Sequence, residues 1–112
     1  MLELPQKYQE IDEVFNDLGE GILVVYQCGS GSFFMLKNLV DSYRKGSTKF
    51  NNSNPNIFAI NEAHPLYKDF NKFYGIPNKT AVLIIKEGKI KEVLYGPFSK
   101  TKLMISILAL EH

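Results

Sequence analysis

The stretch that decides the fold is TAVLIIKEGKIKEVLY, residues 80–95. It begins with an apolar run, so we expect a strand over Thr80 to Ile85 that is covered on both faces of its sheet. Lys86-Glu87-Gly88-Lys89 is typical of a tight turn, and Ile90 to Tyr95 reads as the returning strand. The stretch therefore predicts an antiparallel hairpin.

Two further strands precede this hairpin. Ile22-Leu23-Val24-Val25-Tyr26 is a continuous apolar run rich in β-branched residues, and Ile57-Phe58-Ala59-Ile60 is a second one. The segment between them has helical spacing, so the two strands should be parallel with a right-handed crossover. Together with the hairpin they predict a four-stranded mixed sheet.

Four segments carry apolar residues at the three-and-four spacing of an amphipathic helix. They are Gln6 to Leu18 (Tyr8, Ile11, Val14, Phe15, Leu18), Phe33 to Arg44 (Met35, Leu36, Leu39, Val40, Tyr43), a helix opened by His64-Pro65 and ended by Gly75 (Leu66, Tyr67, Phe70, Phe73, Tyr74), and a last helix capped by Ser99 (Leu103, Met104, Ile107, Leu108). We expect these apolar residues to face the core. The predicted order is α-β-α-β-α-β-β-α, which suits a three-layer α/β/α sandwich.

Composition favours one domain with one core. The chain has 112 residues, of which 45% are hydrophobic and 22% charged. We expect a single domain over residues 1–109, and Leu110-Glu111-His112 resembles the remnant of a cloning tag. The net charge is +1 and the lysines are spread along the chain, which argues against nucleic-acid binding.

Membrane insertion and secretion are not expected. The longest apolar runs, Ile22 to Tyr26 and Ala81 to Ile85, are too short to cross a bilayer, and the N-terminus lacks a signal-peptide pattern. Cys28 is the only cysteine, so no intramolecular disulfide can form, which fits a reducing compartment. We therefore expect a soluble, cytoplasmic protein.

The last third of the chain resembles the thioredoxin family. The similarity rests on Tyr74-Gly75-Ile76, the strand Ala81 to Ile85 and the turn Lys86-Glu87-Gly88, followed by the spacing of Gly96, Ser99-Lys100 and Leu103. Ile22-Leu23-Val24 resembles the central strand of that family, and Ile60-Asn61 the end of the next one. The resemblance implies a thioredoxin-like fold.

Three catalytic features of the family are missing from this sequence. The family places Cys-x-x-Cys at the start of the helix after the central strand, where helix dipole and amide donors stabilise a thiolate and the second cysteine resolves the mixed disulfide. Here the nearest match is Cys28-Gly29-Ser30-Gly31, with Gly31 in place of the resolving cysteine. The buried aspartate of the family falls at Val25, and its cis-proline falls at Thr80. Efficient dithiol exchange is therefore not expected.

Two alignments of Cys28 remain open. In one, Cys28 takes the place of the nucleophilic cysteine; in the other, the catalytic pair is deleted from a shortened loop and Cys28 only lies nearby. Accordingly, Cys28 is either a reactive thiol with a lowered pKa or a small buried apolar residue.

Other candidate sites have simpler explanations. Gly29-Ser30-Gly31-Ser32 could form a phosphate-binding nest, but it lacks a P-loop lysine and a dinucleotide glycine pattern, so a tight turn explains it better. His64 has too few possible partners for a metal site, so we expect a surface histidine that caps a helix. Phe33 and Phe34 follow the glycine turn and could be partly exposed.

The sequence leaves three functional hypotheses. The first is monothiol thiol-disulfide exchange through Cys28, with a protein or a low-molecular-weight thiol as partner and no cofactor or metal. The second is a redox-inactive module that binds a protein through two loops at the same end of the sheet, and the third is a carrier of a small ligand. The expected binding residues are Gly29, Ser30, Gly31, Ser32, Phe33, Lys79 and Thr80.

Overall fold

The computed structural model describes residues 2–29, 31–46, 56–74, 80–96, 101–102 and 105. Its described strands form one sheet in the order β1-β3-β2-β4-β5. The strands are β1 (Leu2–Glu3), β2 (Gly21–Val25), β3 (Asn56–Ile60), β4 (Ala81–Lys86) and β5 (Lys89–Tyr95), and the helices are α1 (Ile11–Leu18), α2 (Gly31–Gly46) and α4 (Tyr67–Tyr74).

The pairing of the strands confirms the predicted mixed sheet. β2 and β3 run parallel, with Ile22 opposite Ile57, whereas β2 and β4 run antiparallel, with Leu23 opposite Leu83. β4 and β5 form the expected hairpin. The pairing of β1 with β3 was not predicted, because a two-residue strand is too short to leave a periodic pattern.

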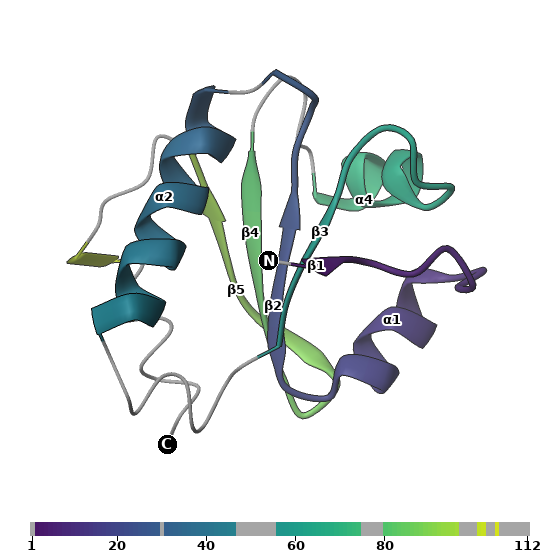
Figure 1. Ribbon diagram of the computed structural model, residues 1–112. Coiled ribbons are helices and arrows are strands. Elements are labelled where there is room, and N and C mark those ends of the chain that lie inside the picture. Colours follow the sequence, from purple (N-terminus) through teal and green to yellow (C-terminus); the bar gives the residue numbers. More distant parts are fainter. Residues whose placement is uncertain are drawn as a thin grey trace.

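Helices cover both faces of the sheet, as Figure 1 shows: α2 lies on one side, and α1 and α4 lie on the other. Side chains of β2 alternate between these two layers. Ile22 and Val24 pack with Leu36 of α2, whereas Leu23 and Val25 pack in the cluster that includes Phe70 of α4. The three-layer α/β/α arrangement is therefore confirmed.

Two predicted helices begin later than expected. The first was expected from Gln6 but begins at Ile11, because residues 6–7 form a turn and residues 9–10 a bend after the segment that pairs with β3, where the N–H of Leu4 donates to the carbonyl of Ala59 at 3.0 Å. The second was expected at His64-Pro65 but begins at Tyr67, after a turn in which the N–H of Tyr67 donates to the carbonyl of His64.

Two residues predicted to face the core are exposed. Met35 of α2 is 64% exposed and Phe73 of α4 is 68% exposed, whereas Leu36 and Phe70 are buried. A helix packed on a sheet buries only one stripe of its surface, and these two residues lie at the edge of that stripe. Of the predicted last helix, the described residues Thr101, Lys102 and Ile105 are helical, and the rest lies outside the described residues, as does the segment 110–112.

Candidate functional site

Cys28 lies in the turn between β2 and α2, three residues before the helix begins, and it is exposed. Its neighbour Gly29 has a φ of 85°, in the left-handed region that residues with a Cβ rarely adopt. The turn therefore requires a glycine at this position. Ser30 lies outside the described residues, and Gly31 and Ser32 belong to the first turn of α2.

Glu62 is the closest charged partner of Cys28, and sequence analysis did not identify it. The backbone N–H of Cys28 donates to both carboxylate oxygens of Glu62, at 3.1 and 3.2 Å. Glu62 follows Asn61 directly after β3, and β3 is the parallel neighbour of β2. The carboxyl ends of parallel strands lie at the same edge of a sheet, so the residues that follow β2 and β3 come close together there. The position of Glu62 just after a predicted strand was the only sequence signal for its contact with Cys28.

The Glu62 carboxylate affects the ionisation of the Cys28 thiol. The hydrogen bond with Glu62 is the main cause that raises the pKa of Cys28, followed by burial and by the negative charge of Glu62. In return, the hydrogen bond from Cys28 lowers the pKa of Glu62. A reactive cysteine normally has a lowered pKa, because a positive group stabilises its thiolate. The surroundings of Cys28 act in the opposite direction.

A buried hydroxyl group lies near the same turn. The Tyr67 hydroxyl is buried and makes no hydrogen bond within the part of the chain that the structure describes. Burial raises the pKa of Tyr67, and the approach of the Gln27 side chain partly offsets this rise. The charge of Glu62 also raises the pKa of Tyr67, so Glu62 acts on both Cys28 and Tyr67.

An aromatic cluster stands beside the turn. The rings of Tyr26 and Phe33 are stacked, with centroids 3.6 Å apart and planes 5° from parallel, and the Asn61 side chain donates to the Tyr26 hydroxyl. Phe34 packs edge-on against Phe33 and is 61% exposed. Phe34 and Met35, which is 64% exposed, are therefore two consecutive large apolar residues exposed at the start of α2. The expectation that Phe33 and Phe34 are partly exposed is confirmed.

Of the second predicted loop, residues 77–80, only Thr80 lies within the described residues. Val25 at the end of β2 is opposite Ala81 at the start of β4, so Thr80 lies beside the beginning of the Cys28 turn. The Thr80 side chain is fully buried, so it does not offer a contact surface to a partner. Lys79 lies outside the described residues.

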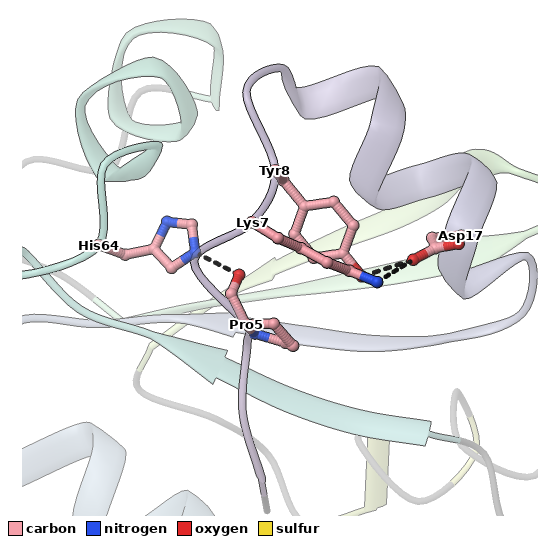
Figure 2. A network of polar contacts seen from close by, with 5 residues as sticks. All are labelled: Pro5, Lys7, Tyr8, Asp17 and His64. Carbon is pink, nitrogen blue, oxygen red and sulfur yellow. Dashed lines mark hydrogen bonds and ion pairs between the residues drawn. The ribbon is translucent and has the colours of Figure 1, made fainter.

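His64 is buried, contrary to the expectation of a surface histidine. Its Nε2–H donates to the Pro5 carbonyl at 3.0 Å, as Figure 2 shows, and its Nδ1 accepts from the Leu66 N–H at 3.1 Å. The ring caps the turn before α4, as expected, but it also holds the N-terminal segment. Among the described residues, no three histidine, cysteine or carboxylate side chains are grouped to hold a metal ion.

Figure 2 also shows how the N-terminal segment is held at its other end. The Tyr8 hydroxyl donates to Asp17 of α1 at 2.7 Å, and Lys7 lies 3.6 Å from the same carboxylate oxygen. The hydrogen bond with Asp17 is the main cause that raises the pKa of Tyr8 to about 12. The contacts of Tyr8 and His64 hold residues 5–8 against the domain.

The comparison with known proteins identifies the fold. No model of a known family matches the chain, and neither does any curated protein. Among solved structures, it resembles reduced desulfothioredoxin from Desulfovibrio vulgaris Hildenborough, with a TM-score of 0.71, 12% identity, and coverage of 97% of this chain and 96% of the other. It also resembles thioredoxin f from spinach chloroplast (TM-score 0.62, 18% identity, coverage 99% and 93%).

A third similar structure is the Malassezia sympodialis thioredoxin Mala s 13, with a TM-score of 0.62, 13% identity, and coverage of 100% of this chain and 92% of the other. At these identities the likeness establishes the fold alone, and the chain has a thioredoxin-like fold. No helix in the described part of the chain is long and apolar enough to span a membrane.

Proposed function

We propose that this thioredoxin-fold chain is a protein-binding module that contacts its partner through Phe34 and Met35, without catalysing dithiol exchange. The observation that carries this proposal is the exposed apolar surface at the start of α2, beside a cysteine whose pKa is raised. Large exposed apolar side chains that adjoin one another are typical of interaction sites.

The chemistry of the turn argues against dithiol exchange. Cys28 is the only cysteine, and Gly31 occupies the position from which a second thiol would resolve a mixed disulfide. Because Glu62 raises the pKa of Cys28, the thiolate fraction at neutral pH is small. A slow nucleophile without a resolving group would turn over poorly.

The geometry of the aromatic cluster favours a partner with an apolar segment. The rings of Tyr26 and Phe33 are stacked on each other, and the Phe34 ring packs edge-on against Phe33. Met35 adds a flexible thioether side chain that adapts to varied apolar surfaces. Another protein of this fold, thioredoxin f2, has been solved in complex with ferredoxin:thioredoxin reductase. It is 19% identical, has a TM-score of 0.60, and the match covers 99% of this chain and 94% of the other.

A second candidate function is monothiol exchange, which the exposure of Cys28 favours. The Cys28 thiolate would attack one sulfur of a low-molecular-weight or protein disulfide, form a mixed disulfide and release the other sulfur as a thiolate. An external thiol would reverse the step, and the Glu62 carboxylate is the nearest acceptor for the thiol proton. A single cysteine suits this chemistry in a reducing, cytoplasmic setting.

Affinity purification with matched variants tests both functions. The baits are the wild type, the double variant Phe34→Gln/Met35→Gln, the variant Ile105→Gln and the variant Cys28→Ser, each compared by quantitative mass spectrometry with and without a reductant. Ile105 is an exposed apolar residue that is not part of the Phe34–Met35 surface, so Ile105→Gln is the matched control. Binding of a purified candidate is then measured by calorimetry.

The two functions give different outcomes. A partner that binds the wild type, Ile105→Gln and Cys28→Ser in the presence of reductant, but not the double variant, supports the binding module. A partner that is lost on Cys28→Ser and released by reductant supports monothiol exchange instead. Equal binding of a partner to all four baits would overturn both assignments.

A further inference from the structure

A groove lies between the start of α1 and the helix α4, on the face of the sheet opposite α2. It encloses a cavity of about 430 Å³. The lining residues are Gln9, Glu10, Ile11, Asp12, Asp69, Phe73 and Tyr74. We call it the α1–α4 groove. It is separate from the Phe34–Met35 surface, so an inference about it does not depend on the function proposed above.

Phe73 gives this groove an apolar wall that is exposed although its neighbours on α4 are buried. Phe73 is 68% exposed, whereas Tyr67 and Phe70 of the same helix pack in the core. The end of α4 is held in place, because the Tyr74 ring packs against Phe70 and the Tyr95 hydroxyl of β5 donates to the Tyr74 carbonyl at 2.5 Å. Phe73 is therefore presented from a fixed helix.

Three carboxylates also line the groove. Glu10, Asp12 and Asp69 are exposed, and the described lining residues include no lysine, arginine or histidine. Within the described residues, the ion pairs join Lys7 to Asp17 and Lys102 to Glu92, so none of these three carboxylates has a cationic partner there. The groove thus combines an exposed aromatic face with three carboxylates that form no ion pair in the described structure.

This combination has a specific complement. An arginine side chain has an aliphatic stem that packs on apolar surface and a planar cation that pairs with carboxylates and lies over aromatic rings. A lysine offers the same charge without the planar face. We propose that the α1–α4 groove binds an arginine-bearing, extended segment of a partner protein, with the stem against Phe73 and the guanidinium among Glu10, Asp12 and Asp69.

A peptide titration followed by ¹⁵N–¹H NMR tests this proposal. The probe is the blocked peptide acetyl-Ala-Leu-Arg-Leu-Arg-Ala-amide, and its control carries citrulline, a neutral isostere, at both arginine positions. The variants are Asp69→Asn and Phe73→Gln. Their matched controls are Glu20→Gln and Ile105→Gln, which change an exposed carboxylate and an exposed apolar side chain outside the groove.

The expected result is saturable shift changes at Gln9–Asp12 and Asp69–Tyr74 that weaken as salt is added. Phe73→Gln should weaken binding about 2- to 5-fold, the loss of an exposed cation–π contact. Asp69→Asn should weaken it by up to about 5-fold, as for an exposed ion pair. Both control variants should bind like the wild type.

Several results would overturn the proposal. One is equal binding of the citrulline peptide, which would show that charge is not recognised. Another is a set of shift changes centred on the start of α2, and a third is equal affinity of the groove variants and their controls. An absence of any shift change at high peptide concentration would also reject the groove as a binding site.

Discussion

The backbone N–H of Cys28 donates to both carboxylate oxygens of Glu62, at 3.1 and 3.2 Å. This contact joins the turn after β2 to the turn after β3 and places a negative charge beside the thiol. A helix start normally favours anions, because its free N–H groups and dipole are positive. Here the anion already present is Glu62, so the thiolate of Cys28 is disfavoured.

Replacing Glu62 should therefore activate Cys28. In Glu62→Gln, the carboxylate is lost that accepts the hydrogen bond from the thiol, the main cause of the raised Cys28 pKa, and its negative charge is lost with it, so the pKa should fall toward its ordinary value. Alkylation of the native protein by iodoacetamide at neutral pH should become several-fold faster, and the midpoint of the pH–rate curve should move to lower pH.

The matched control for this experiment is Glu20→Gln, an exposed carboxylate with no contact to Cys28 in the described structure. It should alkylate at the wild-type rate. If Glu62→Gln reacts no faster than this control, Glu62 does not set the thiol reactivity.

The Tyr8–Asp17 pair predicts a loss of stability at high pH. The pKa of Tyr8 is raised from 10.0 to about 12 in the folded protein, so folding favours its protonated form. This contribution is complete below pH 10.0 and is lost as the pH rises from 10.0 to about 12, because the unfolded chain then loses the proton first. Urea unfolding at several pH values measures the decline.

Tyr8→Phe should flatten this alkaline decline. It should also reduce the free energy of unfolding at neutral pH by about 1 kcal/mol, the net contribution of one hydrogen bond. Acid pH should also destabilise the protein. The hydrogen bond from Tyr8 and the charge of Lys7 lower the pKa of Asp17 in the folded protein, so the stability that this carboxylate contributes is lost as the pH falls through its lowered pKa. An unchanged alkaline slope in Tyr8→Phe would assign the decline to other tyrosines or lysines.

Removing the His64 ring should destabilise the domain. The ring is buried, and each of its nitrogens makes a hydrogen bond, one to Pro5 and one to Leu66. His64→Ala should reduce the free energy of unfolding by about 2–4 kcal/mol. It removes the hydrogen bond to the Pro5 carbonyl and leaves the buried N–H of Leu66 unpaired, and an unpaired buried group costs about 1–3 kcal/mol.

His64→Asn provides the partial rescue. Its side-chain oxygen can accept from the Leu66 N–H as Nδ1 does, but the side chain is too short to reach the Pro5 carbonyl. Its stability should lie between those of the wild type and His64→Ala in thermal unfolding. Equal stability of the two variants would show that the contact with Leu66 contributes little.

One residue of the β4–β5 hairpin turn can be replaced to increase the stability of the protein. Glu87 and Gly88 both have positive φ, 57° and 72°, which matches a turn that prefers Asn-Gly. Glu87→Asn should therefore stabilise the protein by roughly 0.5–1 kcal/mol, because asparagine tolerates the left-handed region better than glutamate does.

Gly88→Ala should have the opposite effect. The added Cβ is held at a positive φ and lies 3.4 Å from Oδ1 of Asn16, so we expect a loss of roughly 1–2 kcal/mol. Gly31→Ala is the control for glycine replacement, because Gly31 lies in the first turn of α2 with nothing near its Cβ. It should be neutral or stabilising by up to about 1 kcal/mol. Denaturation midpoints that fall equally in both alanine variants would refute this distinction.

The sheet was predictable because its strands are continuous apolar runs. Ile22 to Val25 and Ala81 to Ile85 are buried on both faces of the sheet, so every residue in these runs is apolar and the sequence indicates their burial directly. Helix boundaries were less predictable. Tyr8 has the spacing of an α1 core residue and is indeed buried, but it reaches the core from a non-helical segment that contacts with Asp17 and His64 hold in place.

The candidate site was predictable only in part. Cys28 and the aromatic pair Phe33 and Phe34 could be named from the sequence, since they follow a strand and a glycine turn. Glu62 could not, because it is an exposed glutamate 34 residues away from Cys28. The exposure of Phe73 was also missed, because its spacing on α4 matches that of the buried Phe70.

The amino-acid sequence alone determined the elements of the sheet, the single thiol and the absence of a resolving cysteine at Gly31. These features depend on residue identity and on the pattern of buried and exposed side chains within a single strand or helix. Tertiary structure alone decided that Glu62 contacts Cys28 and that Phe73 lines the same groove as Glu10 and Asp12. These relations depend on the pairing of β2 with β3 and on the packing of α4 beside α1, which bring together side chains that no local pattern connects.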